Sequence, residues 1–353
     1  FPPGDFGQIE RYLVRMLHTA TTRTLRPALA ALPRLGNAAA DPIQAEAAPR
    51  RRKSSSKAIP AVQRIASAIA NGRVTFLLGN YIHLGATPTG DAFYRRMAER
   101  FEVQFPLRDR TEVARVVLQK HGPAELLEWY RAEFELENVA ASEVIRFLAS
   151  LPGLLRSSDR AREAGLTLLT TNFDRVLERE FERIGEPIHL YYYLNAGPDC
   201  GRFAYRAPDG SECIVERPEH FTPPDDNGTC IVKLNGGLLG DSSIPHSLCV
   251  AKGDFENLAS RLPACLPAGI RSRIESRSML CLGHGLYELD VEQLIRHVQN
   301  TGAPRSSWAV QLVPQRFRAD FAGRQIYWRE HRLELVEHDL GKFVKQLRRE
   351  LAL

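Results

Sequence analysis

The stretch "LTLLTTNFDRVLERE", residues 166–180, changes character in its middle. An apolar run ends in the polar side chains of Thr170, Thr171, Asn172 and Asp174, and helical spacing follows. This order indicates a buried strand whose carboxyl end faces a ligand or solvent. Asn172 could orient a water or a ribose hydroxyl, whereas Asp174 also suits an ordinary helix N-cap.

Five further apolar runs have the same form: "VTFLLG" (74–79), "CIVKLNG" (230–236), "MLCLGHG" (279–285), "WAVQLV" (308–313) and "LELVE" (333–337). Helical patterns separate them: Thr89–Phe101, Thr111–Gln119, Ala124–Phe134, Ala141–Leu151, Asp174–Ile184, Asp290–Gln299 and Lys342–Leu351. Alternation of apolar strands with helices predicts an α/β protein with a doubly wound, Rossmann-like parallel sheet of about six strands. We expect a helical insertion lobe at 102–157 and a long, mobile functional loop at 186–229.

The sequence before the α/β domain (59–353) divides into two parts. Residues 1–36 predict accessory helices, although their Arg-rich, acid-poor composition also occurs in mitochondrial transit peptides. Residues 37–58 have little to bury and predict a flexible basic linker. Its run Arg50–Lys53 could contact phosphates, but a solvated linker is the simpler interpretation.

Composition excludes several classes of protein. The 353 residues are 44% hydrophobic and 25% charged with a net charge of +5, so nucleic-acid binding by the main domain is not predicted. No apolar run is long enough for a membrane helix. The six cysteines form no Cys-x-x-Cys pair, which predicts no zinc site and favours a reduced, cytoplasmic setting.

Glycines follow three of the predicted strands. Gly79 ends the run at 74–79 and Asn80 follows it, and Gly283 and Gly285 lie at the end of the run at 279–285. We expect the backbone at these glycines, together with Thr170 and Thr171, to approach a nucleotide. In "CIVKLNGGLLG" (230–240) the glycines come after Asn235. An amide stands there, at a strand end where a catalyst would need a group that carries a proton.

Taken in order, these strand ends resemble the sirtuin superfamily, in particular the sirtuin-like domains of bacterial NAD-degrading, anti-phage defence proteins. The resemblance covers about residues 72–350 and rests on "FLLG…LGATPTG", "LTTNFDRVLE", "VKLNGGL", "LCLGHGLYELD" and "LELVEHDLGKFVKQLRREL". It implies a sirtuin-type fold and NAD as the cofactor. The family's catalytic Asn matches Asn172, its accompanying Asp matches Asp174, and its histidine falls on Asn235.

Two strand ends depart from the family pattern. The first turn usually reads Gly-Ala-Gly-x-Ser, but here Asn80 and Tyr81 replace its glycines and His83 its serine. The third strand usually ends Lys-Leu-His-Gly, but here Asn235 cannot act as a general base. We therefore expect Asn80 and Tyr81 to obstruct the dinucleotide.

The resemblance and its departures give three hypotheses. The leading one is a catalytically weakened or inactive domain of a bacterial defence system, which binds a nucleotide or a protein partner. The second is an active NAD hydrolase that uses Asn172 to position water. The third is a nucleic-acid-associated module, which the low net charge disfavours. We expect weak binding of NAD or ADP-ribose, a protein partner, and a chain that is able to form homo-oligomers.

Overall fold

The computed structural model describes residues 59–87, 90–104, 111–134, 139–157, 165–223, 228–239, 244, 248–286, 292, 295–296, 305–312 and 318–352. The chain divides into two compact units, residues 1–57 and 58–353, and only the second contains described residues. Three predictions therefore lie outside the described residues: the helices at 1–36, the linker at 37–58 and the helix at Asp290–Gln299. Of that last helix, only three isolated positions are described. Within the described part, no helix is both long and apolar enough to cross a membrane.

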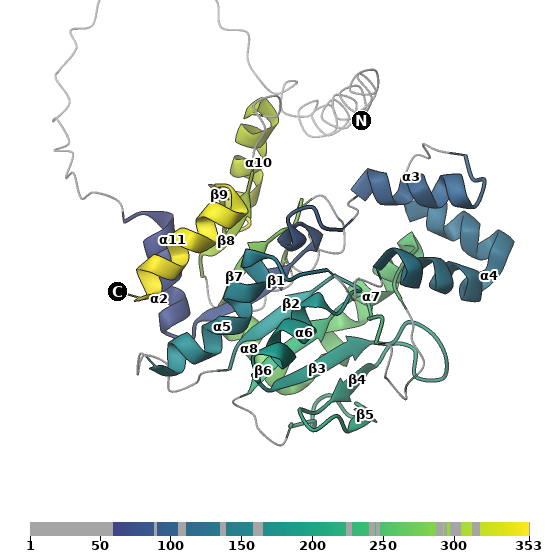
Figure 1. Cartoon of the computed structure of the whole chain (residues 1–353), viewed down its shortest axis with the longest axis horizontal. Coiled ribbons are helices and arrows are strands. Elements are labelled where there is room, and N and C mark those ends of the chain that lie inside the picture. The colour runs from purple at the N-terminus through teal and green to yellow at the C-terminus, as the bar shows by residue number, and fades with distance from the viewer. Residues whose placement is uncertain are drawn as a thin grey trace, which may run out of the picture. The chain divides into compact units, whose positions relative to one another are not determined.

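The strands of the described residues form one mixed sheet of order β5-β4-β3-β6-β2-β1-β7-β8-β9 (Figure 1). They are β1 Val74–Leu78, β2 Thr167–Thr170, β3 Ile188–Tyr193, β4 Phe203–Arg206, β5 Glu212–Ile214, β6 Thr229–Lys233, β7 Ser278–Leu282, β8 Ser307–Gln311 and β9 Leu333–Glu337. All pairs from β3 to β9 in this order are parallel, and β4 and β5 are antiparallel. Each of the six predicted runs forms a strand, which confirms the α/β, doubly wound fold.

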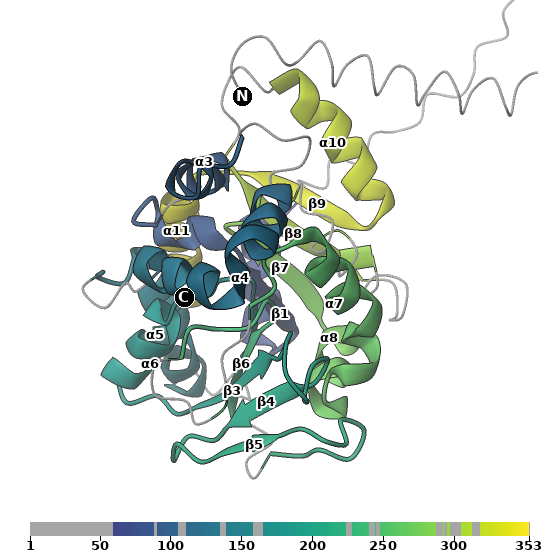
Figure 2. The same cartoon turned by 90° about the vertical axis from the view of Figure 1, so that its right-hand side faces the viewer.

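Helices cover both faces of the sheet. Successive side chains of each central strand point to opposite faces, so an apolar strand contributes to a core on each side. In β1, Phe76 packs into one core cluster and Leu77 into the other. The first cluster is covered by α2 Ala61–Ala70, α5 Glu143–Ser157, α6 Val176–Arg183 and α11 Leu340–Ala352, and the second by α7 Lys252–Cys265, α8 Ala268–Ser276 and α10 Arg318–Glu330. Figure 2 shows α5 and α6 on one side of the sheet and α7 and α8 on the other.

The predicted helical insertion at 102–157 divides between two cores. Helices α3 Gly90–Arg100 and α4 Thr111–Phe134 build a separate aromatic cluster, and α4 is kinked at Gly122 ahead of Pro123. By contrast, the buried residues of α5 belong to the main core, where α5 contacts α6 and α11. Only α3 and α4 thus form the small lobe.

The prediction of a long loop at 186–229 is wrong for much of its length, because β3, β4 and β5 lie within it. The run "IHLYYY" of β3 combines aromatic and branched residues, which suit a pleated surface. Tyr191 and Tyr193 pack into one core cluster and Leu190 and Tyr192 into the other. Gly197, Pro198 and Asp199 lie between β3 and β4, and Pro208, Asp209 and Gly210 lie between β4 and β5.

Candidate functional site

The register of the sheet brings four strand ends to one edge. Lys233 of β6 pairs with Thr170 of β2, Thr170 with Leu78 of β1, and Leu78 with Leu282 of β7. Because these four strands are parallel neighbours, the residues that follow them leave the sheet side by side. The crossing of the chain from β6 to β7 places the two on opposite sides of β1 and β2, which makes this edge a topological switch point where α/β proteins bind ligands.

Asn172 is buried at this edge beside a histidine from the first turn. The 3₁₀ turn η1, Asn80–His83, begins directly after Gly79 and directs His83 inward, where it is 3% exposed. Asn172 Nδ2 lies 3.4 Å from Gly79 O and 3.4 Å from His83 Nε2. His83 Nε2 lies 3.1 Å from Asp174 Oδ2. The three side chains therefore lie side by side, and the tautomer of His83 decides whether its Nε2 accepts from Asn172 or donates to Asp174.

Asp174 has two structural roles in this chain. Its Oδ1 accepts a hydrogen bond of 2.9 Å from the Val176 amide, so it caps α6 as an N-terminal residue should. Burial opposes ionisation of its carboxyl, but the hydrogen bond and charge of His83, the charge of Lys233 and the Val176 amide outweigh burial and hold the pKa of Asp174 below its ordinary value. Asp174 is thus a buried carboxyl group with a lowered pKa, and it lies beside His83.

Lys233, the last residue of β6, binds the loop that joins β2 to α6. Its Nζ donates to Asp174 O at 2.6 Å and to Glu178 Oε1 at 2.7 Å, and both charged side chains are about 1% exposed. A methyl group on Gly237 would lie 2.6 Å from Lys233 Cε, so only glycine fits over this lysine. A buried ion pair of this kind holds β6 and the start of α6 together.

Asn235, the residue in place of the family's histidine, reaches the loop after β2. Its Nδ2 donates to Thr171 O at 3.4 Å, and its Oδ1 is buried and has no hydrogen-bond partner among the described residues. Its backbone carbonyl accepts from the Cys249 amide. Asn235 therefore holds the edge together but offers no titratable group.

The turns after β1 and β7 pack directly against each other. A methyl group on Gly79 would lie 2.5 Å from Gly283 O, and one on Gly283, whose φ is 75°, would lie 2.6 Å from Ile82 N. The amides of Tyr81 and Ile82 donate to Gly283 O and Gly79 O. In a phosphate cradle such turn amides would face the ligand. Here they are used within the protein.

The remaining predicted nucleotide contacts also have internal roles. Thr170 Oγ1 donates to Leu78 O and accepts from the Asn172 amide, and Thr171 N donates to Leu78 O. Asn80 Oδ1 accepts from Thr87 Oγ1, and Gly285 O accepts from Arg324. The edge thus collects all the predicted residues and uses their polar groups in the fold.

Tyr81 differs from the expectation that it fills the first turn. It is 53% exposed, whereas His83 occupies the interior next to Asn172. A four-residue 3₁₀ turn explains this difference, because its residues point in successive directions about the axis. The side chain that closes the turn is His83.

The loop after β2 also carries the small lobe. Phe173, between Asn172 and Asp174, packs its ring edge-to-face against Tyr130 and Phe134 of α4 at centroid distances of 5.3 and 5.7 Å. The position of α4 is therefore coupled to the two polar residues on either side of Phe173.

Three residues that complete the site were not among the predicted site residues: His83, Lys233 and Glu178. His83 is the ionisable residue of the first turn. Lys233 is a charge inside an apolar run, and Glu178 lies four residues after Asp174 on the same helical face. A charge within an apolar run was the signal that could have revealed the buried pair.

One family model matches part of this region. Residues 166–336 match the family model of the SIR2-like domain. This part of the chain is similar to that family. The match includes β2, β6 and β7, whereas β1 and the first turn with His83 lie before it.

Two further comparisons add little detail. Among solved structures, a chain described in work on the mechanism and regulation of Sir2 enzymes aligns with a TM-score of 0.38 and 9% sequence identity, over 82% of this chain and 96% of that chain. This likeness is too low to transfer a site. No curated protein matches the sequence.

The residues at the edge fit intact NAD poorly. The Gly79 and Gly283 turns fill each other's space, and the Asn172 amide already has two neighbours at hydrogen-bonding distance. Among the described residues, no group of three or more His, Cys, Asp or Glu side chains could hold a metal ion.

Proposed function

We propose that the SIR2-like domain is a catalytically weakened or inactive member of the defence-type sirtuin branch, which acts by binding a nucleotide or a protein partner. One observation carries this proposal. Asn172, the residue that would position ribose or water, is 8% exposed, and its Nδ2 lies 3.4 Å from both Gly79 O and His83 Nε2, which itself lies 3.1 Å from Asp174 Oδ2. Substrate would have to displace the buried His83 from these polar neighbours, which is costly.

The missing proton acceptor supports the same conclusion. Cleavage of the nicotinamide–ribose bond needs electrostatic support for an oxocarbenium-like state, and a base to activate the attacking water or hydroxyl adds to the rate. Asn235 supplies no base, and the Nε2 of His83 is engaged by Asp174. The assignment to bacterial defence rests on the motif resemblance.

Nicotinamide release from NAD tests the catalytic part. We expect no release above background from the full chain or from Asn235→His, since His83 still closes the site. We expect release from the double variant Asn235→His with His83→Ser, and its loss when Asn172→Ala is added. Thermal melting of each variant separates inactivity from unfolding. Release by the unmodified chain, abolished by Asn172→Ala, would instead establish an active hydrolase.

Protection of a bacterial host against phages tests the binding role. If the domain acts by binding a protein partner, the parent and Asn172→Ala should protect equally. Loss of protection in Asn172→Ala, at unchanged protein level, would favour nucleotide binding or catalysis, which the nicotinamide assay tells apart. We expect the parent to bind NAD with a dissociation constant on the order of a millimolar, equivalent to about 4 kcal/mol.

A further inference from the structure

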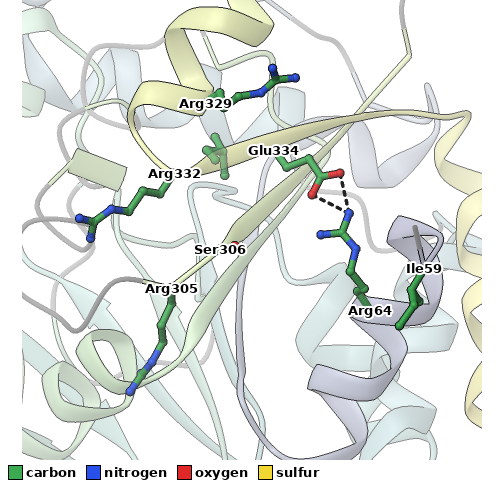
Figure 3. Close-up of a pocket in the computed structure, with 8 residues that line it drawn as sticks. Ile59, Arg64, Arg305, Ser306, Arg329, Arg332 and Glu334 are labelled. Carbon is green, nitrogen blue, oxygen red and sulfur yellow. Dashed lines mark hydrogen bonds and ion pairs between the residues drawn. The ribbon is translucent and has the colours of Figure 1, made fainter. Parts of the chain in front are cut away.

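The opposite edge of the sheet carries a hollow lined by arginines. It has a volume of about 770 Å³, within the usual range for ligand sites, and is lined by Ile59, Arg64, Arg305, Ser306, Arg329, Arg332, Leu333 and Glu334 (Figure 3). Ser307 and Leu333 are the paired first residues of β8 and β9, so the hollow lies at the amino ends of the strands. A five-residue strand spans about 16 Å, which separates this edge from the SIR2-like site.

A second hollow of about 580 Å³ adjoins the first and shares Arg64, Arg305 and Ser306 with it. Its lining adds Arg73 and the hydroxyl side chains of Ser67, Ser276 and Ser278. Together the two hollows are lined by five arginines and a single carboxylate, that of Glu334. A surface of this composition attracts anions.

Most of this positive charge has no partner among the described residues. Arg64 Nη2 binds both carboxylate oxygens of Glu334, at 2.7 and 2.8 Å, and so neutralises the only acid. Within the described part of the chain, the side chains of Arg73, Arg305, Arg329 and Arg332 make no hydrogen bond or ion pair. Arg329 lies in the last turn of α10, where a positive charge interacts favourably with the helix dipole. This position explains why Arg329 has a positive charge without a partner, but it does not explain the other three arginines.

One local feature points to a bound ligand. Arg305 Nη1 is buried from solvent yet has no hydrogen-bond partner among the described residues, and a buried donor of this kind is costly unless a ligand or water accepts from it. Arg332, in the lining of the same hollow, has a φ of 55°, the left-handed conformation that often ends a helix such as α10.

We propose that the hollow at the amino edge is a second binding site, which takes a small ligand bearing several phosphate groups, such as a nucleoside triphosphate or an inorganic oligophosphate. Figure 3 shows Arg64 turned to Glu334 while Arg305, Arg329 and Arg332 point in other directions. Guanidinium groups spread around a hollow suit several linked phosphates better than a single one. The proposal is independent of the activity of the SIR2-like site.

Calorimetry with sodium tripolyphosphate on the full chain tests the site. We expect submillimolar binding that weakens as salt is added, and orthophosphate to bind at least tenfold more weakly. Arg305→Ala should weaken tripolyphosphate binding at least tenfold. Arg332→Gly should weaken it several-fold without loss of thermal stability, because glycine accepts the left-handed backbone. Glu334→Gln should tighten it by removing the competing carboxylate.

Three controls locate the binding. Arg131→Ala, which removes an exposed arginine from α4, and Asn172→Ala should both leave the affinity unchanged. ATP should compete with tripolyphosphate if the hollow accepts a nucleotide; failure to compete would restrict the ligand to inorganic oligophosphates. The proposal is overturned if tripolyphosphate binding survives the combined variant Arg305→Ala with Arg332→Gly. It is also overturned if only the combined variant Arg51→Ser with Arg52→Ser abolishes that binding. Binding of single-stranded DNA without binding of tripolyphosphate would overturn it as well.

Discussion

The two edges of the central sheet use charge in opposite ways. At the carboxyl edge, His83, Asp174, Lys233 and Glu178 are buried and paired with one another. At the amino edge, Arg305 and its neighbouring arginines line an open hollow, and the pair of Arg64 with Glu334 is about 40% exposed.

This difference separates stability from binding. A buried pair costs much to break, because the remaining charge is left without solvent or partner. An exposed arginine contributes little to the fold but is available to a ligand. Among the described residues, the charges of the carboxyl edge therefore stabilise the fold, whereas most arginines of the amino edge have no partner.

The largest expected effect is that of Lys233→Met, which leaves Glu178 buried and unpaired. We expect a loss of about 3–5 kcal/mol in the free energy of unfolding, measured by urea denaturation. Lys233→Met combined with Glu178→Leu should recover much of that loss. Arg305→Ala, at the other edge, should lower stability by no more than about 0.5 kcal/mol, because the buried donor that it removes has no partner among the described residues. Equal losses at the two edges would refute the contrast.

Asp174→Asn should remove part of the acid sensitivity of folding. Because the pKa of Asp174 is lower in the folded protein, the unfolded chain binds more protons between that value and the ordinary pKa. Its stabilising contribution is complete above about pH 3.9 and is lost as the pH falls through the folded pKa. The stability difference between parent and variant should therefore shrink in acid. A difference that grows in acid would contradict the assigned direction.

Gly79→Ala should destabilise the protein by about 1–3 kcal/mol, since the added methyl group meets the backbone of Gly283 rather than a side chain that can move. Gly253→Ala is the matched control. Nothing lies within 4 Å of a methyl group on Gly253 in α7, so stability should stay the same or rise slightly. If Gly79→Ala is neutral, the two turns are able to separate, and the site has room for a dinucleotide.

The sequence predicts the strands of this fold better than the contacts between them. The six apolar runs and the polar residues after them, Asn172 above all, could be identified because the period of a buried strand and its end are local patterns. The strand β3 was mistaken for a loop because the turns beside it contain Gly, Pro and Asp.

The contacts that close the site depend on distant parts of the chain. His83 meets Asn172 only because β1 and β2 are neighbours and because η1 turns inward. Lys233 and Glu178 are 55 residues apart. The arginines of the amino edge come from α2, from the start of β8 and from the end of α10, and no local pattern connects them. Their meeting follows from the strand order, which the spacing of residues does not specify.

The smallest expected effect is that of the exposed pair at the amino edge. A double-mutant cycle with Arg64→Ala and Glu334→Gln should give a coupling energy of about 0.2–1 kcal/mol in urea denaturation, because both side chains are about 40% exposed and water screens their attraction. Raising the salt concentration should reduce that coupling further. In the same variants, Glu334→Gln should tighten tripolyphosphate binding while barely changing stability. A coupling above about 2 kcal/mol would mean that this pair stabilises the fold as the buried pairs do. The arginines of the amino edge would then belong to the structure rather than to a binding site.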